Sequence, residues 1–410
     1  MSSPEGPRHE PLARRRTRLE RTALPVLFAI IPLYGTLAGL ADTPGIPPLV
    51  PRAAAALFGI AAVVALLAVA PAAVRAARRD ALTFAFFAPG LATIVSAIPG
   101  FDPPLGIGLG IFVTGMGGAG LVLARTADAA TTRACIRTFL WSALAASLLA
   151  LAMVVSHRPA AIYAFDNGRA VGTFLNPNEL AAYTLIALGV AVPLAAGSRG
   201  RDRLATVCAI VLAITLGATF SRWGALSAVC GVAVYALAAR ARPLLAAALV
   251  VAVAGIALNA VAGASHHNPR DTAARTVAWR TGLTTFLRFP LLGVGPLAFP
   301  KTYGELRPPD APGMRTAVAF DPHSLPIAFA ADGGIVAVVT LTASFTIVLR
   351  AVLREARRAP ARPRALGLAL AAALVALLLD TSINTITLFF PLGLQVVPLA
   401  LAVVRTDALR

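Results

Sequence analysis

Residues 324–349 read SLPIAFAADGGIVAVVTLTASFTIVL, and Asp332 is the one charged residue in this stretch. An α-helix rises about 1.5 Å per residue, so a run of this length crosses a bilayer core of roughly 30 Å. The run begins directly after Asp321-Pro322-His323, where the one long polar segment of the chain ends. The stretch therefore predicts a membrane-spanning helix with a histidine at the membrane edge.

The rest of the chain has the same apolar character. Of its 410 residues, 58% are hydrophobic and 13% are charged, whereas soluble domains contain about 25% charged residues. Apolar runs of about 17–22 residues recur along the chain, which is the length that a bilayer-spanning helix needs. A β-barrel would instead show alternating segments of about 10 residues. The sequence therefore predicts an all-α polytopic membrane protein.

The apolar runs also predict how the chain is organised. We expect about 12 transmembrane helices, at 24–40, 53–73, 81–98, 105–124, 138–155, 179–196, 204–220, 224–239, 244–262, 324–349, 365–383 and 385–404. The segments are then a cytoplasmic basic tail at 1–23, spans 1–9 within 24–262, a periplasmic loop at 263–323, spans 10–12 within 324–404 and a cytoplasmic tail at 405–410. Thr22–Leu40 follows a basic cluster, as a signal peptide would. Because it lacks a clear cleavage site and another apolar run follows quickly, we interpret it as an uncleaved first span.

The distribution of charge predicts the orientation of the spans. The formal net charge is +18, and 25 of the 36 basic residues fall in the tails and loops that the span count places on one side. The opposite side holds 11 basic residues, seven of them in the long loop. Basic residues are enriched in the cytoplasmic loops of membrane proteins. The pattern therefore predicts cytoplasmic N- and C-termini, and it explains the net charge without a nucleic-acid partner.

The cysteines and histidines predict neither a disulfide framework nor a metal site. Cys208 and Cys230 lie inside apolar runs, and Cys135 lies in a predicted cytoplasmic loop. The five histidines show no ligand spacing, with the adjacent pair His266-His267 as the one open alternative. We therefore expect no metal and no cofactor.

The predicted outer loop, residues 263–323, is basic although the orientation rule disfavours basic outer loops. It holds seven basic and four acidic residues, and an anionic ligand is the simplest reason for that charge. Within it, Arg275–Phe289 predicts an amphipathic helix, with one face formed by Arg275, Trp279, Gly282, Leu283 and Phe286. We expect this helix to lie on the membrane surface. Gly293-x-Gly295-Pro296 after it predicts a turn.

Three arginines are candidates for binding an anionic donor. Arg222 lies between two apolar runs with almost no loop, where a charge is costly unless it reaches the interface or meets an anion. It is either an interfacial anchor beside Trp223 or a diphosphate ligand, since a planar guanidinium suits bidentate contact with phosphate oxygens. Arg275 and Arg280 either attract lipid headgroups or form a second clamp on the same diphosphate.

The other candidate substrate-binding residues lie in the two outer segments. Asn176-Pro177-Asn178-Glu179 precedes an apolar run, and we expect Asn178 to cap that helix, with Glu179 favourable at its N-terminus. Asn176 and Asn178 also have side chains that can shape a sugar pocket. Arg169 in the segment 156–178 and Lys301 in the long loop are further basic candidates for donor binding.

His323 has two interpretations. It is either a helix-entry residue at the interface or a general base. An imidazole with an unperturbed pKa of about 6.5 suits proton abstraction from a sugar hydroxyl at neutral pH. We take His323 as the catalytic candidate, together with Arg222 and Arg275.

Four blocks of this sequence resemble the O-antigen ligase and polymerase superfamily of membrane glycosyltransferases. The blocks are Gly172-Thr173-Phe174-x-Asn176-x-Asn178-x-x-Ala181, Ser221-Arg222-x-Gly224, Arg275-x-x-x-Trp279 followed by Phe289-Pro290-Leu291-Leu292-Gly293-Val294-Gly295, and His323-Ser324 followed by Asp332 and Gly334. The resemblance covers about residues 170–340. There are departures from the family's pattern: Ser324 stands for Asn, Asp332 for Glu and Ala337 for Gly, and Trp223 interrupts the Ser-Arg-Gly turn.

The resemblance implies a GT-C-like fold and an enzyme of the bacterial inner membrane. It implies that a glycan moves from undecaprenyl diphosphate to an acceptor hydroxyl at the periplasmic face, without a nucleotide sugar or a metal. By the same resemblance, Arg222 and Arg275 hold the diphosphate and His323 activates the acceptor, which in the ligases is the lipid A–core sugar. Preorganised positive charge of this kind can stabilise a leaving group strongly.

Other functions stay open from the sequence. A polymerase of the same superfamily joins two lipid-linked repeats, and protein O-glycosylation is a third reaction, which the short tail after the last span disfavours. A secondary transporter or lipid flippase also suits twelve spans, but it predicts internal repeats and ionisable residues near the midplane. Asp42, Asp102, Asp332 and Asp380 lie near the ends of predicted spans instead. Asp332, roughly two turns into its span, is either a buried functional group or the partner of an arginine. We therefore favour the enzyme.

Overall fold

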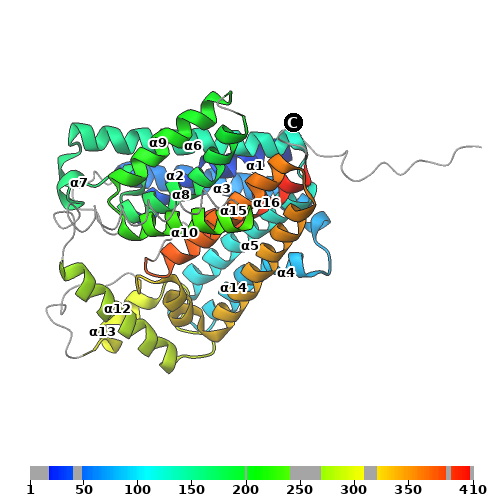
Figure 1. The fold of residues 1–410 in the computed structure, drawn as a ribbon. Coiled ribbons are helices and arrows are strands. Elements are labelled where there is room, and N and C mark those ends of the chain that lie inside the picture. The colour runs from blue at the N-terminus through cyan, green and yellow to red at the C-terminus, as the bar shows by residue number, and fades with distance from the viewer. Residues whose placement is uncertain are drawn as a thin grey trace, which may run out of the picture.

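The computed structural model of the protein describes residues 18–39, 49–198, 201–240, 269–308, 321–384 and 389–406. Within these ranges the regular elements are helices, and none is a strand (Figure 1). The helices are α1 (Arg18–Ala29), α2 (Ile31–Gly39), α3 (Leu49–Ala76), α4 (Ala81–Ala97), α5 (Pro103–Thr126), α6 (Ala129–Ser156), α7 (Ala160–Phe165), η2 (Gly172–Phe174), α8 (Pro177–Gly197), α9 (Arg203–Ala218), α10 (Arg222–Ala238), α12 (Pro269–Arg288), α13 (Phe299–Leu306), α14 (Leu325–Arg358), α15 (Ala361–Thr381) and α16 (Phe389–Arg405).

Six helices of the described part are long and apolar enough to cross a membrane, namely α3, α5, α6, α8, α14 and α15. Three shorter apolar helices, α4, α9 and α10, accompany them. The prediction of an all-α protein with several membrane-spanning helices is therefore confirmed in this coarse form. The count of twelve spans and the GT-C-like arrangement stay predictions, and the expected span at 244–262 lies outside the described residues.

The first expected span, 24–40, is broken into two helices rather than continuous. α1 ends at Ala29, Ile30 forms a turn and α2 follows. Pro32 is the physical reason, because it has no N–H to donate to the carbonyl of Phe28. That carbonyl accepts a hydrogen bond from Ser142 Oγ of α6 at 3.3 Å instead. The break therefore provides a polar contact that joins the first helix to α6.

Small residues allow the helices to pack closely. A Cβ on Gly117 of α5 would lie 1.9 Å from the carbonyl oxygen of Phe86 in α4. A Cβ on Gly231 of α10 would lie 3.0 Å from the side chain of Ala376 in α15. Close approach at small residues is a main source of helix association in a bilayer. The contact between Gly231 and Ala376 fixes how α10 lies along α15.

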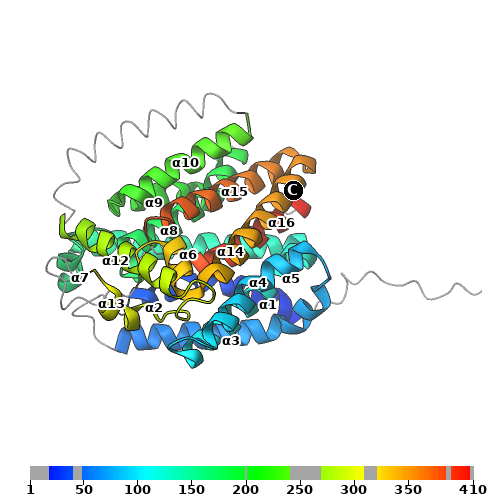
Figure 2. The ribbon, with the colours of Figure 1, turned by 90° about the horizontal axis from the view of Figure 1, so that it is seen from below.

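Two ends of the helix bundle can be distinguished (Figures 1 and 2). At the loop end, α12 and α13 lie beside the first turns of α14. At the tail end, residues from the C-terminal parts of α5, α14 and α16 line a common pocket. α5 runs from the loop end to the tail end, because Gly100, just before α5, contacts Gly295 beside α13. α14 runs the same way, because its first turns contact α12 and α13.

The expected amphipathic helix at Arg275–Phe289 is present as α12, which begins earlier, at Pro269. Its most buried residues include two polar ones. Thr281 and Thr285 are fully buried, whereas Leu283, which belongs to the predicted face, is 48% exposed. The hydroxyls of both threonines donate to carbonyls one turn earlier, at 2.8 and 2.9 Å, which makes their burial tolerable.

Gly282, which lies on the predicted face, lets α12 pack closely against α14. A Cβ at this position would lie 2.5 Å from Ile327 Cγ2 in the first turn of α14. Only a glycine lets the axis of α12 come this near. The small side chain at Gly282 therefore contributes to the packing of α12 on α14.

Candidate active site

The predicted site residues lie where several helices begin or end at the loop end. α8, α10 and α14 begin there and α15 ends there, with α12 alongside (Figure 1). The N-terminus of a helix presents unpaired N–H groups and a positive dipole end. Three helix starts in one region therefore favour negative charge.

A chain of polar contacts joins the segment before α8 to the turn between α9 and α10. Arg169 donates from Nε to the carbonyl of Thr219 at 2.8 Å and from Nη2 to Asn178 Oδ1 at 3.3 Å. The same Asn178 oxygen accepts a hydrogen bond from Ser221 Oγ at 3.0 Å. The first two motif blocks, which are distant in sequence, therefore form one structure. The roles of Arg169 and Asn178 in substrate binding stay predictions.

Asn176, rather than the expected Asn178, caps α8. Its Oδ1 accepts hydrogen bonds from the N–H groups of Asn178 at 2.8 Å and Glu179 at 3.4 Å. Pro177 then occupies the first helical position, which proline favours because its missing N–H would be unpaired there. Gly172 before it has φ of +57°, which a glycine adopts without strain. This block therefore shapes the backbone at the entrance of α8.

Arg222 begins α10 with an exposed side chain. Ser221 caps the helix by accepting the N–H of Gly224 at 3.2 Å. Gly224 is required for packing, since a Cβ there would lie 2.8 Å from Ala181 in α8. Within the described part of the chain, the guanidinium of Arg222 forms no hydrogen bond or ion pair. Trp223 is 38% exposed, so the residue that interrupts the motif turns away from the packed side.

Arg275 is linked to the end of α15 by a short chain of hydrogen bonds. Its Nη1 donates to Asn384 Oδ1 at 2.8 Å, and Asn384 Nδ2 donates to Asp380 Oδ1 at 3.2 Å. Asn384 is 3% exposed and Asp380 is fully buried. The link therefore orients the guanidinium of Arg275.

His323 is fixed through its backbone, while its ring is 44% exposed. Its φ of +51° lies in the left-handed region, which costs a residue with a Cβ about 1 kcal/mol. The N–H of His323 donates to Asp321 Oδ1 at 2.6 Å, and its carbonyl accepts from Trp279 Nε1 at 3.2 Å. Nδ1 of the ring lies 3.7 Å from the same Asp321 oxygen. The arrangement leaves Nε2 as the nitrogen that can accept a proton from an incoming hydroxyl.

α14 is broken at Gly334, where φ is +61° and ψ is −159°. The segment that follows α12 fills this break, since the N–H of Ile335 donates to the carbonyl of Pro290 at 2.8 Å. A Cβ on Gly334 would lie 2.3 Å from the carbonyl oxygen of Leu291. The third and fourth motif blocks are thus two sides of one close backbone contact, which requires glycine.

Asp332 lies at this contact and serves the loop. Its Oδ2 accepts the N–H of Leu297 at 3.2 Å, and its carbonyl accepts the N–H of Gly295 at 2.9 Å. Gly293 has φ of +68°, and a Cβ on it would lie 2.3 Å from the backbone of Asp332. The expected turn at Gly293-x-Gly295-Pro296 is therefore confirmed. The carboxylate within the apolar run is explained by its contact with this turn.

Two further candidates lie apart from these contacts. Arg280 is exposed on α12, five residues beyond Arg275 and hence on another face. Lys301 Nζ donates to Asp102 Oδ2 at 2.8 Å and so joins α13 to the start of α5. The hydrogen bond from Lys301 lowers the pKa of Asp102. The expected donor-binding roles of Arg280 and Lys301 stay predictions.

Helix geometry places Arg222 and Asn384, the hydrogen-bond partner of Arg275, at a similar level along α10 and α15. Arg222 precedes the contact of Gly231 with Ala376 by nine residues, and Asn384 follows it by eight. With a rise of about 1.5 Å per residue, these distances are about 13 and 12 Å along antiparallel helices. Arg222 therefore reaches the level of Asn384, to which Arg275 is bonded. One turn of α12 then leads from Arg275 to Trp279 and on to His323.

Among the residues that the structure describes, no group of three or more His, Cys, Asp or Glu side chains has the geometry of a metal site. His266-His267, the open alternative from the sequence, lies outside these residues. The site therefore consists of arginines, a histidine and hydrogen-bonding side chains. Such groups can bind an anion, hold a leaving group and transfer a proton.

The fold and this polar end define a class, namely a multi-helix membrane protein with a basic, histidine-bearing site at the ends of its helices. The family model described as O-antigen ligase (Wzy_C) matches residues 207–342. This segment, about a third of the chain, contains three of the four motif blocks. This match supports the resemblance to the O-antigen ligase and polymerase superfamily that the motifs indicated. No curated protein matched the chain.

The sequence did not show the roles of Asn384, Asp380 and the indole N–H of Trp279. One signal was available for the first two. Asp380 and Asn384 are four residues apart, a spacing that places side chains together on a helix face, at the end of an apolar run. Nothing in the sequence pairs them with Arg275, because that contact depends on how α12 lies on the bundle.

Proposed function

We propose that this protein transfers a glycan from undecaprenyl diphosphate to an acceptor hydroxyl at the periplasmic face of the bacterial inner membrane. The first acceptor we propose is the lipid A–core sugar, which makes the reaction O-antigen ligation. The family match supports a glycosyltransferase-like enzyme that uses lipid-linked glycans. The proposal includes the location of the N- and C-termini, both of which it places in the cytoplasm.

One observation carries the proposal. α12 presents Arg275 and, one turn later, the indole that binds the backbone of His323. A single helix thus positions a cation suited to a diphosphate and a base suited to a hydroxyl. Arg222 begins α10 at the same level, with a guanidinium that is exposed. A transporter has no need for a fixed histidine beside an anion site.

The proposed step balances without a metal or a nucleotide. Nε2 of His323 removes the proton of the acceptor hydroxyl, and the acceptor oxygen forms a bond to the anomeric carbon of the donor. The bond between that carbon and the diphosphate oxygen breaks, and the diphosphate leaves with the electron pair. Arg222 and Arg275 stabilise the negative charge that grows on the leaving group. Proton transfer to a positioned base accelerates such steps by about 10²–10⁴-fold.

Reconstitution tests the proposal directly. The full chain is inserted into vesicles that contain purified undecaprenyl-diphosphate-linked glycan, with lipid A–core in one sample and no acceptor in the other. We expect glycan on lipid A–core in the first sample. Longer lipid-linked chains in both samples would identify a polymerase of the same superfamily instead. If neither product forms while the lipid-linked glycan changes leaflets, the protein is a flippase and the enzyme proposal is wrong.

A further inference from the structure

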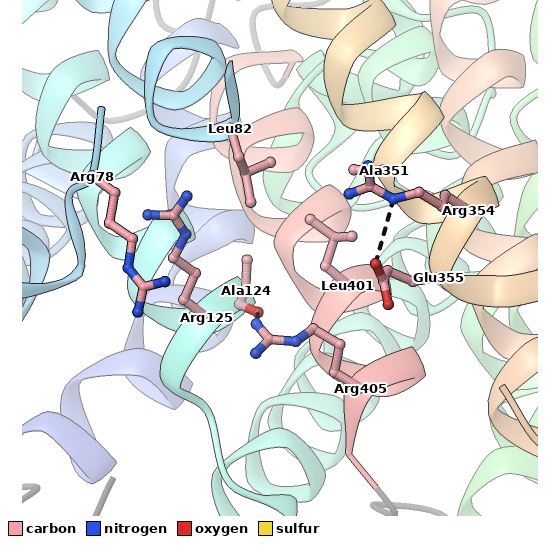
Figure 3. Close-up of a pocket in the computed structure, with 9 residues that line it drawn as sticks. All are labelled: Arg78, Leu82, Ala124, Arg125, Ala351, Arg354, Glu355, Leu401 and Arg405. Carbon is pink, nitrogen blue, oxygen red and sulfur yellow. Dashed lines mark hydrogen bonds and ion pairs between the residues drawn. The ribbon is translucent and has the colours of Figure 1, made fainter. Parts of the chain in front are cut away.

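A pocket of about 310 Å³ lies at the tail end, away from the site described above (Figure 3). Its walls come from the connection after α3, the start of α4 and the last turns of α5, α14 and α16. The lining residues are Arg78, Leu82, Ala124, Arg125, Ala351, Arg354, Glu355, Leu401 and Arg405. All the arginines lie in segments that the charge bias predicts to be cytoplasmic.

Four arginines around one hollow create an excess of positive charge. Two carboxylates oppose them: Glu355 in the wall, 3.5 Å from Arg354 Nε, and Asp80, which pairs with Arg125. The formal excess is therefore two positive charges. Like charges that share a partly enclosed space repel one another, and a bound anion relieves this repulsion.

The arginines differ in how much of their hydrogen-bonding capacity is used. Arg125 donates to the carbonyl of Ala76 at 2.6 Å and also binds Asp80, so it is part of the wall. Arg405 donates from one nitrogen to the carbonyl of Ala124. A guanidinium has five N–H donors, so Arg405 keeps donors for a ligand. The side chains of Arg78 and Arg354 are both exposed at the rim.

The pocket is also partly apolar. Leu82 and Leu401 lie between the pair Arg78 and Arg125 on one side and Arg354 on the other (Figure 3). A fully hydrated ion gains nothing from leucine, whereas the phosphate ester of a lipid brings apolar carbon next to its charge. The volume is near the lower end of small-molecule pockets, about 300–1,000 Å³, which suits a headgroup rather than a whole lipid.

We propose that this pocket binds a phosphate group, and that the group is carried by an anionic phospholipid of the leaflet at the tail end. Basic pockets between membrane helices are a known form of anionic lipid recognition. The planar guanidinium forks of Arg78, Arg354 and Arg405 hold the phosphate oxygens, and Leu82 and Leu401 contact the carbons next to them. The bound lipid joins the ends of α5, α14 and α16, which otherwise repel through their arginines.

Native mass spectrometry of the purified, delipidated full chain tests this proposal. Phosphatidylglycerol is titrated into the wild type, the pocket variant R78Q/R354Q and the control variant R357Q/R358Q. The control removes the same charge from the exposed last turn of α14, outside the pocket. We expect the apparent Kd to rise about tenfold or more in the pocket variant, since each arginine near an anionic lipid contributes measurably, and by less than about twofold in the control. R78Q and R354Q are also measured singly, so a folding defect of the double variant does not remove the test.

Two comparisons decide the source of the phosphate. Phosphatidylcholine carries a phosphate but no net charge, and inorganic phosphate carries charge without a lipid. We expect wild-type protein to bind both more weakly than phosphatidylglycerol. Equal loss of binding in the pocket and control variants would overturn the site. Tight binding of inorganic phosphate that displaces phosphatidylglycerol, or equal binding of phosphatidylcholine, would overturn the lipid.

Discussion

The indole N–H of Trp279 donates a hydrogen bond of 3.2 Å to the carbonyl oxygen of His323. The donor lies on α12 and the acceptor lies just before α14, so the packing of α12 sets the position of the histidine backbone. Asp321 Oδ1 holds the other side by accepting the N–H of His323 at 2.6 Å. The proposed base is therefore placed by its neighbours, while 44% of its side chain stays exposed for a substrate.

Removing the indole N–H should slow transfer without unfolding the protein. Trp279→Phe keeps an aromatic ring and loses one hydrogen bond, which contributes about 1 kcal/mol. We expect kcat for glycan transfer to fall roughly fivefold, with KM for the donor changed less. Trp141→Phe is the control, since Trp141 is 60% exposed on α6. Equal rates in the two variants would show that the bond to His323 does not position the base.

Replacing the imidazole should abolish transfer. His323→Asn is the sharpest variant, because asparagine tolerates the left-handed backbone that His323 adopts, with φ of +51°. We expect a loss of about 100-fold or more in transfer, with an unchanged amount of protein in the membrane. His157→Asn is a matched control, since His157 is also left-handed, with φ of 54°. Near-normal transfer by His323→Asn would exclude the general-base role.

Local features were predictable from the sequence because they depend on neighbouring residues. The apolar runs gave the helices, and Gly293-x-Gly295-Pro296 gave its turn. The Ser221-Arg222 motif marks the start of α10, where serine caps the helix.

The contacts between elements were not predictable in this way. The hydrogen bond of Arg275 to Asn384 joins residues 109 positions apart, and that of Arg169 to Asn178 depends on the turn beside Thr219. The close approach of α12 to Ile327 at Gly282 likewise depends on where α14 lies. Periodicity describes one helix, whereas these contacts depend on the partner helix.

Arg222 should contribute through the shape of its guanidinium as well as its charge. Arg222→Lys keeps the charge and loses the bidentate fork. We expect KM for the lipid-linked donor to rise roughly tenfold, in proportion to one lost charge-assisted hydrogen bond. Arg201→Lys, between α8 and α9, changes an exposed arginine outside the site. A donor KM like that of the wild type in Arg222→Lys would argue against diphosphate binding at this position.

The ion pair of Asp102 with Lys301 predicts a dependence of stability on pH. The hydrogen bond from Lys301 lowers the pKa of Asp102 in the folded protein. The stability that the ion pair contributes is therefore complete above the ordinary carboxyl pKa of about 3.9. This stability is lost as pH falls through the lower pKa of Asp102 in the folded protein. Asp102→Asn keeps a side-chain oxygen to accept the N–H of Leu105, and removes the charge.

Thermal midpoints between about pH 2 and 6 measure this dependence. Above about pH 4, we expect a higher thermal midpoint for the wild type than for Asp102→Asn. In stronger acid, we expect the two midpoints to become equal. Glu305→Gln, an exposed change on α13, is the control and should follow the wild type. A constant difference between wild type and Asp102→Asn over the whole range would show that the pair with Lys301 does not contribute.

The break in α14 should tolerate no side chain at Gly334. Its φ of +61° and ψ of −159° lie in a region that is essentially restricted to glycine. A Cβ there would also lie 2.3 Å from the carbonyl oxygen of Leu291. Strain and clash together should destabilise Gly334→Ala by about 3 kcal/mol or more. Transfer should fall with stability, because the displaced loop carries α12 and its contact with His323.

Gly108→Ala provides the comparison for this last substitution. Gly108 lies in α5 with no atom within 4 Å of an added Cβ, so alanine there should be neutral or slightly stabilising. Thermal unfolding in detergent and the reconstituted transfer assay are measured for both variants. If Gly334→Ala unfolds at the temperature of the wild type, the loop does not need the glycine contact, and the structural reason given for this motif is wrong.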